Sequence, residues 1–538
     1  MGSFALGRSA RNSLQNATGA GQRIVASMPG LGVVVMVLAL VLLTILLGAV
    51  VALGALQLTL LLAGLIMVVP FLLFISSKNM LPLLFAAVFV IQGLGQYFLQ
   101  MRMLTWMATG MGALLFGRAI LEIFFANPHK QVQPHPGAGR VIAAVSLYMA
   151  FYFFSMSLGS ATPMQIVSAV RFALPMYGVM FAMYWFHWST ARLETIWWMI
   201  VAIMVIQLPF ATYQHFFMMS KLGWDGVVGT MGSNMSPMLV IFSLSAALFV
   251  LARWSHGLTS GWKAGLTISV FLAIVLLGEV KAVVLWIPLG ILIVLRRRVL
   301  RNILAFATFC IFITLFVVST FTVYNALYWG EHAQGDSITE KFDSTSGYIL
   351  DADGINYRTG EVSRMASMAL WYNDPVPTVV ERLVGYGPGA SANNQGTGRG
   401  VVAQRYGILQ LNASAVSLLL WDTGILGGLA YGSILLAMLI TGWKLTNRQN
   451  APPEARAIAD TSFAVLVLLM TTIVYNRLLM DESSAQLLFF FCAGCIVQLT
   501  RFPRVSAAIA ADSNQPVRAH AGRVLHAMPT PAIKGARR

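Results

Sequence analysis

Residues 24–77 read IVASMPGLGVVVMVLALVLLTILLGAVVALGALQLTLLLAGLIMVVPFLLFISS and contain no charged side chain. A membrane-spanning helix needs about 20 consecutive apolar residues, so this stretch is long enough for two of them. We expect spanning helices near 31–55 and 59–77, joined by a tight turn around Gln57. The stretch is too long for the apolar core of a signal peptide, and no small-residue cleavage site is evident. It therefore predicts insertion into a membrane.

The composition of the whole chain agrees with that prediction. Hydrophobic residues make up 58% of the 538 residues, charged residues make up 10%, and the mean hydropathy is +0.75. Ordinary soluble domains contain about 25% charged residues, so this composition excludes a soluble enzyme. Three cysteines are too few for a disulfide framework, and Cys492 and Cys495 form a lone C-x-x-C inside an apolar run. We expect that pair to be small packing residues rather than a metal or redox site.

Further apolar runs continue the pattern along the chain. The run 264–295 is interrupted only by Glu279 and Lys281, which predicts two short helices with a turn at that pair. The other expected spans lie at 80–99, 104–125, 141–160, 165–186, 194–213, 237–253, 302–323, 421–441, 459–478 and 484–500. The total is about 14 helices, and it predicts an all-α polytopic membrane protein.

Basic residues indicate the orientation of these helices. The chain has 35 basic and 19 acidic residues, a net charge of +16. Clusters lie at 296–301, at 444–456 and in the tail after Leu499, and an even number of helices places them on one side with the N-terminal segment. Short loops rich in Lys and Arg stay in the cytoplasm. We therefore expect both termini to be cytoplasmic, and the basic excess requires no nucleic-acid partner.

Hydropathy divides the chain into five parts. We expect a cytoplasmic segment at 1–30, helices 1–11 at 31–323, an extracytoplasmic loop at 324–410, helices 12–14 at 411–500, and a basic disordered tail at 501–538. The loop contains nine of the 19 acidic residues and six basic residues. A loop of this length is uncommon as a mere connection, so we expect it to carry the function. A transporter would instead place its site near the bilayer midplane.

Several charged residues lie at the predicted outer ends of helices. They are Arg171, Glu279, Lys281, Asp422, and the group Arg477, Asp481 and Glu482. Each has a plain structural explanation: snorkelling for Arg171, a turn ion pair for Glu279 and Lys281, a helix N-terminal acid for Asp422, and solvation for the last group. Charges at a membrane are nevertheless often functional. Cations at one depth beneath a large loop suit a lipid diphosphate.

The loop adds further cations and a glycine-rich segment. The cations are Arg358, Arg364, Arg382, Arg399 and Arg405. Gly385-Tyr386-Gly387-Pro388-Gly389 has three glycines at period two, which permit either close backbone approach to a ligand or simple flexibility. It lacks the strand–turn–helix context of a dinucleotide site. No hydrolase motif is present, and Asp351-Ala352-Asp353-Gly354 lacks the later acid of a calcium loop.

Three blocks of sequence occur in a distinctive order. They are Gly229-Thr230-Met231-Gly232-Ser233-Asn234; Arg364, Trp371 and Asn373-Asp374-Pro375 followed by the glycine segment; and LLLWDTGILG at 418–427. Over about residues 225–430 the chain resembles the O-antigen polymerase and O-antigen ligase superfamily, polytopic enzymes that act on lipid-linked glycans. Lys281 stands where that family often has Ser-Arg, and Ala413-Ser414 stands where its ligases carry a His-Asn pair. The second departure favours a polymerase over a ligase.

The resemblance implies a fold and a reaction. The fold would be a GT-C-like membrane glycosyltransferase in the bacterial inner membrane. The reaction would join oligosaccharide repeats carried on undecaprenyl diphosphate into an exopolysaccharide, capsule or O-antigen chain, with neither metal nor other cofactor. Expected partners are the lipid-linked substrate, membrane lipid, and a flippase and chain-length regulator of the same pathway. An O-antigen ligase, or a lipid-linked oligosaccharide flippase, remains the alternative.

The resemblance also implies roles for individual residues. Arg364, Arg171 and Lys281 would neutralise the diphosphate leaving group, and Asp422 would deprotonate or orient the acceptor hydroxyl. The expected glycan-binding residues are Arg358, Gly385, Gly387, Gly389 and Arg405.

Overall fold

The computed structural model describes most of the chain between residues 75 and 501. The described ranges are 75–97, 104–125, 135–218, 226–232, 235–278, 280–324, 349–394, 398–448 and 450–501, together with a few isolated residues. Nearly all of the predicted helices at 31–55 and 59–77, most of 325–348 and the tail from 502 therefore lie outside the described residues. So does Glu279.

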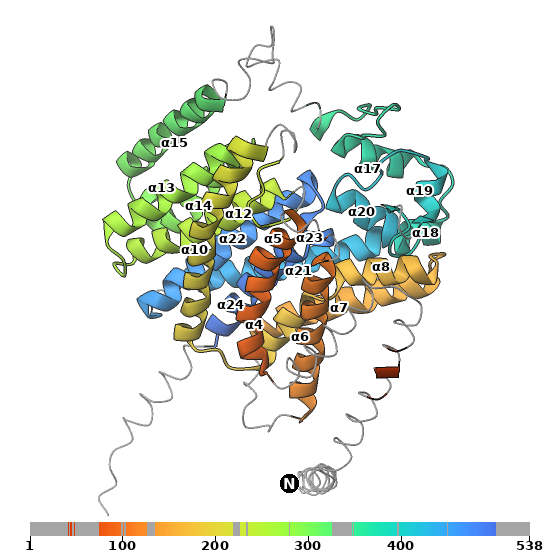
Figure 1. The fold of residues 1–538 in the computed structure, drawn as a ribbon, viewed down its shortest axis with the longest axis horizontal. Coiled ribbons are helices and arrows are strands. Elements are labelled where there is room, and N and C mark those ends of the chain that lie inside the picture. Colours follow the sequence, from red (N-terminus) through yellow and green to blue (C-terminus); the bar gives the residue numbers. More distant parts are fainter. Residues whose placement is uncertain are drawn as a thin grey trace, which may run out of the picture.

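The described residues form a helical assembly (Figure 1). Its longer helices are α4 (Ser77–Ala86), α6 (Thr105–Phe125), α7 (Pro136–Leu158), α8 (Pro163–Ala173), α9 (Tyr177–Trp185), α10 (Thr190–Tyr213), α12 (Ser236–Ser255), α13 (Gly261–Gly278), α14 (Val283–Val299), α15 (Ile303–Tyr324), α17 (Arg364–Asn373), α21 (Gly424–Thr446), α22 (Pro453–Tyr475) and α24 (Ser483–Leu499). The shorter elements are η1 (Ala87–Ile91), α5 (Gln92–Tyr97), η4 (Gln214–Met218), α18 (Val379–Val384), β1 (Asn393–Asn394), β2 (Gly398–Arg399), α19 (Val401–Arg405), α20 (Ala415–Asp422) and α23 (Leu478–Asp481).

The helices are long and apolar enough for a membrane. Among the described residues, nine helices can span one, and the pair α8 and α9, bent by 49°, raises the number to ten. The predicted all-α polytopic membrane fold is confirmed at this level. The predicted break in the run 264–295 is also confirmed, because α13 ends at Gly278 and α14 begins at Val283.

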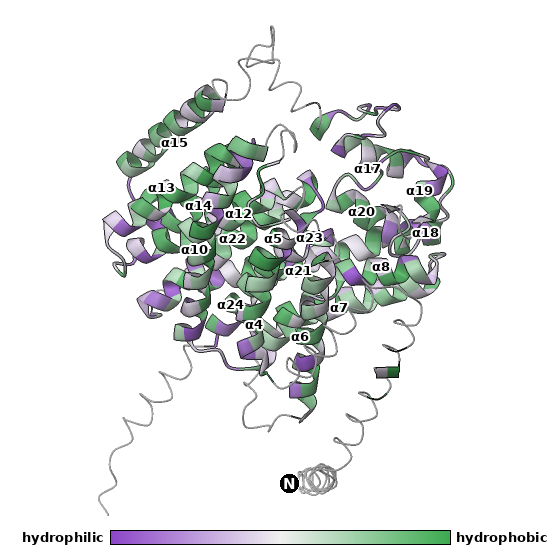
Figure 2. Ribbon diagram, viewed as in Figure 1, coloured by the Kyte–Doolittle hydropathy of each residue, from purple (hydrophilic) through white to green (hydrophobic). Residues whose placement is uncertain are grey.

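Burial separates central helices from peripheral ones. In α12 and α22, 83% and 78% of the spanning window is buried inside the protein, whereas in α15 only 6% is buried. Figure 1 shows α15 at the edge of the assembly, and Figure 2 shows mostly hydrophobic residues along it, in agreement with its mean hydropathy of 2.4. A helix that is apolar all round is a membrane span or is buried in a core. We therefore read α15 as a lipid-facing span and α12 and α22 as the centre.

The first motif block packs against two π turns. Thr230 is fully buried, its amide donates to the side-chain oxygen of Gln207 at 2.7 Å, and its hydroxyl donates to the carbonyl oxygen of Phe89 in η1. The side-chain oxygen of Gln214 in η4 accepts the amide of Gly229 at 2.7 Å. These bonds satisfy backbone groups that a membrane interior would otherwise leave unpaired. The described part of this block therefore packs between α10, η1 and η4 and is hydrogen-bonded to all three.

The segment 349–414 forms a layer of short elements, which we call the loop layer. Figure 1 shows α17, α18 and α19 together beside α20 and α8. Trp371, Tyr386 and Trp421 are buried in its small hydrophobic core. The two-residue strands β1 and β2 pair antiparallel. The longest helix of the loop layer is α17, and Ser363 caps it by accepting the amide of Ala366.

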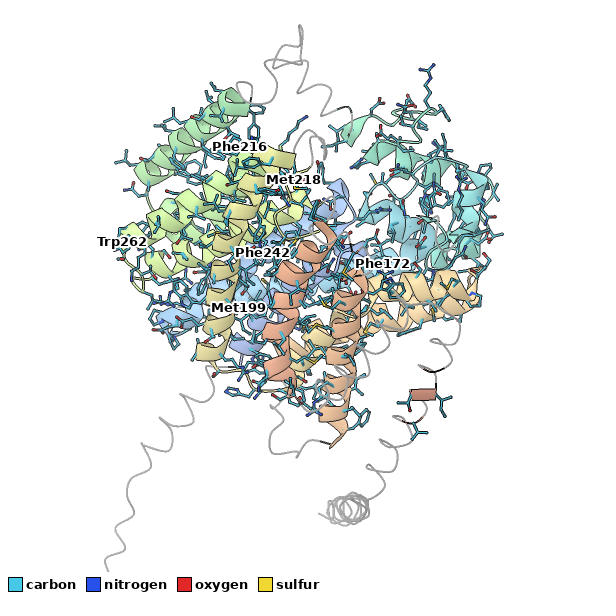
Figure 3. The ribbon with its side chains drawn as sticks, viewed as in Figure 1. Phe172, Met199, Phe216, Met218, Phe242 and Trp262 are labelled. Carbon is cyan, nitrogen blue, oxygen red and sulfur yellow. The ribbon has the colours of Figure 1, made fainter. Side chains whose placement is uncertain are left out.

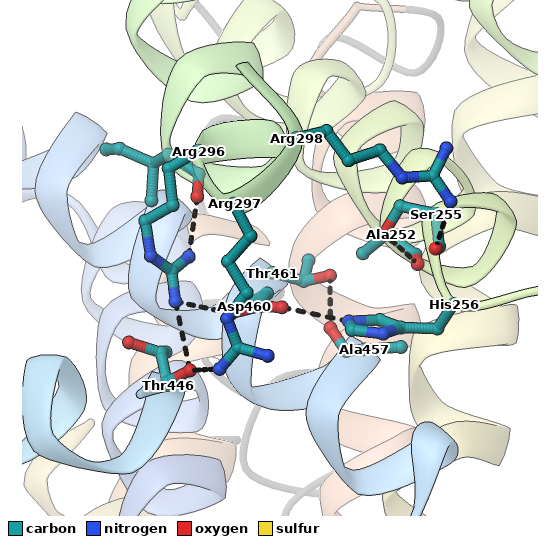
Figure 4. Close-up of polar contacts among 11 residues, drawn as sticks. Ala252, Ser255, His256, Arg296, Arg297, Arg298, Thr446, Ala457, Asp460 and Thr461 are labelled. Atoms are coloured by element: carbon teal, nitrogen blue, oxygen red, sulfur yellow. Dashed lines mark hydrogen bonds and ion pairs between the residues drawn. The ribbon is translucent and has the colours of Figure 1, made fainter. Parts of the chain in front are cut away.

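Part of the basic cluster at 296–301 is buried. Nη2 of Arg296 lies 3.0 Å from Oδ1 of Asp460 in α22, and Nε2 of His256 lies 2.9 Å from Oδ2 of the same carboxylate (Figure 4). Nη2 of Arg296 also donates to the carbonyl oxygen of Thr446 at 3.1 Å. The charge of Arg296 therefore joins α12, α14, α21 and α22, in addition to any role in orientation.

Candidate functional site

A cavity of about 500 Å³ lies where the loop layer meets the ends of the helices. Its walls come from α7, α8, the loop layer, α20 and the turn around α23. Phe172, labelled in Figure 3, marks its position beside α8. Its polar lining consists of Tyr148, Tyr152, Gln165, Ser168, Asn393, Asn412, Asp422, Thr423, Arg477, Asp481 and Glu482. Tyrosine, amide and carboxylate side chains of this kind can bind a ligand rich in hydroxyl groups.

Asp422 ties the glycine segment to the helices. It is the last residue of α20, and α21 begins at Gly424, so the expectation that Asp422 opens a spanning helix is wrong. Its Oδ2 accepts the amide of Gly389 at 2.7 Å, and its Oδ1 accepts the amide of Ser391 at 2.9 Å. The carbonyl oxygen of Asp422 accepts the amide of Gly387 at 3.0 Å. Burial raises the pKa of Asp422 to about 6, although the two amides favour its ionised form.

The glycines of that segment are required by backbone packing. Gly385 has a φ of 81° and a ψ of −179°, a conformation that is essentially restricted to glycine. A Cβ there would overlap the carbonyl group of Asp422, and a Cβ on Gly387 would lie 3.0 Å from the Cα of Gly159. The close approach expected of these residues is therefore made to α20 and to the end of α7. Of the three glycines, Gly389 lines the cavity.

The turn between α22 and α24 supplies the charged wall of the cavity. Nε of Arg477 lies 3.2 Å from Oδ2 of Asp481, and Glu482 follows directly. Burial, and then the charge of Asp481, raises the pKa of Glu482 to about 8, against the opposing charges of Arg477 and Arg171. Burial also raises the pKa of Asp481, while Arg477 lowers it. This group, which was expected to be solvated, lines the cavity and is partly buried.

Two predicted cations lie beside the cavity. Arg171 occupies the last turn of α8, and its guanidinium lies 3.6 Å from the centroid of the Trp106 ring. Its neighbour Phe172 lines the cavity. Nε of Arg364, at the start of α17, donates to the carbonyl oxygen of Tyr475 at 2.8 Å, two residues before Arg477. Arg171 thus precedes a lining residue in α8, and Arg364 bonds the chain two residues before another, but neither side chain is among those that line the cavity.

Other predicted residues lie elsewhere. Lys281 is exposed in the turn between α13 and α14, and these helices lie on the far side of the assembly from α8 (Figure 1). Arg358 is exposed in a turn of the loop layer. Arg405 forms an ion pair with Asp374, and its guanidinium lies 5.3 Å from the centroid of the Tyr406 ring and 5.9 Å from that of Trp421. Arg405 is therefore an exposed residue whose guanidinium packs against the edge of the loop layer's core.

The cavity also contains residues that sequence reasoning did not select. Tyr148 and Tyr152 lie in an ordinary apolar run, and nothing in their local sequence marks them. Arg477, Asp481 and Glu482 did carry a signal, because three charges fall between two long apolar runs. In the part of the chain that the structure describes, no group of three or more His, Cys, Asp and Glu side chains could hold a metal ion.

Comparison with known proteins adds no relative. No model of a known family matches the chain, and no curated protein is significantly similar to it.

Proposed function

We propose that this protein is a membrane glycosyltransferase that polymerises oligosaccharide repeats carried on undecaprenyl diphosphate. In this proposal it has about 14 spans in a GT-C-like arrangement in a bacterial inner membrane. The loop layer faces the extracytoplasmic side, and both termini face the cytoplasm. The protein would work with a flippase and a chain-length regulator of the same pathway.

The observation that carries the proposal is the composition of the cavity wall. Arg477 lines it, Arg171 precedes the lining residue Phe172, and Arg364 bonds the carbonyl oxygen of Tyr475, two residues before Arg477. Guanidinium groups bind phosphate oxygens with strong, directional hydrogen bonds. Tyrosine, asparagine and glutamine side chains on the remaining wall suit sugar hydroxyls. A site with both features suits a sugar attached to a diphosphate.

The proposed reaction needs a stabilised leaving group. The acceptor hydroxyl attacks the anomeric carbon of the donor, and the bond from that carbon to the lipid diphosphate breaks. The electron pair leaves with the diphosphate, and fixed cations neutralise the added charge. We assign this role to Arg477, which lines the cavity, and to Arg171 and Arg364, which lie next to it in α8 and α17, whereas Lys281 lies in the distant turn between α13 and α14. Asp422 keeps the glycine segment in place beside the donor.

A deletion strain tests the pathway. We expect it to accumulate lipid-linked single repeats and to lack polymer. Long polymer that is not attached to its acceptor would indicate a ligase, and repeats confined to the cytoplasmic leaflet would indicate a flippase. Unchanged lipid-linked glycans would overturn the proposal.

A matched pair of arginine variants tests the site. Purified protein receives the lipid-linked repeats extracted from the deletion strain, and chain length is measured by electrophoresis. Arg364→Ala should lose polymer formation. Arg364→Lys should recover only part of the activity, because lysine lacks the planar guanidinium group that can bind two phosphate oxygens at once. Arg358→Ala is the control in the same layer, since its side chain is exposed. Normal polymer from Arg364→Ala would remove Arg364 from leaving-group stabilisation.

A further inference from the structure

We propose, on the basis of the function proposed above, that Glu482 is the general base that takes the proton from the acceptor hydroxyl. Asp422 is then a positioning residue that holds the glycine segment. The two carboxylates line the same cavity but have different surroundings. Those surroundings decide which of them is available for proton transfer.

Asp422 is already engaged on both oxygens. Each oxygen accepts a backbone amide, from Gly389 at 2.7 Å and from Ser391 at 2.9 Å, and the residue is only 6% exposed. Hydrogen bonds to an ionised carboxylate stabilise it and weaken it as a base. Taking up a proton would also break a contact that holds the loop layer against α20. Asp422 is therefore suited to positioning.

Glu482 is engaged differently. It precedes α24, is half-buried, and lines the cavity. Its neighbour Asp481 forms an ion pair with Arg477 at 3.2 Å, while the carboxylate of Glu482 has no ion pair or hydrogen bond to the described residues. A carboxylate in a cavity without a committed partner is free to accept a proton from a ligand.

The charges around Glu482 tune its basicity. Asp481 stands beside it on the same turn, with Arg477 at the start of that turn. Arg171 faces it from α8, and Asp422, Tyr148 and Tyr152 line the cavity from α20 and α7. Burial and Asp481 bring the pKa of Glu482 to about 8. A general base works best when its pKa lies near the working pH.

The proton and the bonds balance in one displacement. The acceptor O–H bond breaks as Glu482 takes the proton, and the oxygen bonds to the anomeric carbon. The bond from that carbon to the diphosphate oxygen breaks, and its electron pair leaves with the lipid diphosphate beside Arg477 and Arg171. Glu482 then returns the proton to solvent. No oxidant or further reactant is required.

The test measures turnover, donor binding and pH dependence on the purified full-length protein. The substrate is the lipid-linked repeat fraction extracted from the deletion strain, and binding is measured as retention of that fraction. Glu482→Gln should lower turnover by about 10²–10⁴-fold with donor binding unchanged. Wild-type kcat/KM should rise with pH and level off above about 8, and the residual rate of Glu482→Gln should lack that rise. Glu454→Gln, at the other end of α22, is the control and should match wild type.

Two further variants make the assignment decisive. Glu482→Asp keeps a carboxylate and should retain part of the rate with a shifted pH profile. If Glu482→Gln does not fold, the pH profile of Glu482→Asp decides the question. A Glu482→Asp profile that matches that of wild type overturns the proposal. Asp422→Asn should loosen the loop layer while its residual activity keeps the wild-type pH dependence.

The outcomes separate this inference from the proposed function. Wild-type turnover by Glu482→Gln, in an assay where wild type makes polymer, overturns the base assignment alone. Loss of donor binding in a folded Glu482→Gln also overturns it, because Glu482 would then bind the donor. A wild-type protein that makes no polymer from these repeats overturns the proposed function itself.

Discussion

Gly385 shows how closely the site depends on single residues. Its backbone adopts φ 81° and ψ −179°, and its amide donates to the carbonyl oxygen of Glu381 at 2.8 Å, while the next two residues cross α20. The carbonyl oxygens of Trp421 and Asp422 accept the amides of Tyr386 and Gly387, each at 3.0 Å. There is no room between the two backbones for a side chain. The position of Asp422 in the cavity therefore depends on a residue that lacks a Cβ.

Gly385→Ala should destabilise the loop layer. The added methyl would overlap the carbonyl of Asp422, and the backbone conformation alone costs about 1–3 kcal/mol for any residue other than glycine. We expect faster proteolysis within 349–414 and a large loss of activity. Gly428→Ala is the matched control, because a Cβ at Gly428 in α21 meets nothing within 4 Å. Equal protease resistance in the two variants would contradict this packing.

At the scale of helices, one buried carboxylate joins four of them. Asp460 of α22 contacts Arg296 of α14 and His256 after α12, and Arg296 reaches the end of α21 through Thr446 (Figure 4). The side chains of Asp460 and Arg296 are 3% and 8% exposed. Removing charges from water is costly, and their mutual attraction offsets that cost only while both partners remain.

Asp460→Asn should therefore be strongly destabilising. It leaves the charge of Arg296 buried without its partner, which typically costs about 3–5 kcal/mol. We expect a lower thermal unfolding midpoint in detergent, followed by the fluorescence of the protein's tryptophans. The double variant Arg296→Met with Asp460→Leu should recover part of the loss, because neither charge then remains buried. Glu454→Gln, on the same helix, should unfold as wild type does; a similar loss there would refute the specific role of Asp460.

At the scale of the whole molecule, the cavity and the buried ion cluster of Arg296, Asp460 and His256 lie in different parts of the protein. The cavity lies under the loop layer, among α7, α8, α20 and α23, whereas Arg296 lies in the last turn of α14. The ends of α21 and α22 show the separation directly. The α22 helix begins near the connection after Thr446 and ends at Tyr475, which bonds Arg364 of the loop layer. One crossing of α22 thus separates the two sites.

Cysteine labelling tests this arrangement in the membrane. Thr359 in the loop layer and Asn450 between α21 and α22 are both exposed. In a background with Cys310→Ser, cysteines at these two positions should react with an impermeant reagent from opposite sides of the membrane. The orientation proposed above places Thr359 on the extracytoplasmic side. Labelling of both from the same side would exclude the arrangement.

The sequence by itself determined the helices. Long apolar runs predicted most of the long helices to within about six residues, and the pair at 279–281 predicted the break between α13 and α14. The single span expected at 165–186 is wrong, because α8 and α9 are separate helices bent by 49°, and α23 was not predicted. This works because a helix in lipid must satisfy its own backbone hydrogen bonds and present apolar side chains along its full length. A membrane span can therefore be recognised from the hydropathy of its own residues, without knowledge of its neighbours.

Only the tertiary structure decided the site. The cavity brings together Tyr152, Gly389, Asp422 and Glu482, which belong to four separate segments of the chain. No local pattern could assign Asp422 to a hydrogen bond with Gly389, or bury Arg296 beside Asp460, because a side chain's environment depends on which helices pack around it. For the same reason, Arg477, Asp481 and Glu482 line the cavity, although the sequence indicated a solvated turn. Charge and hydropathy are properties of one residue, whereas burial and pairing are properties of the packed molecule.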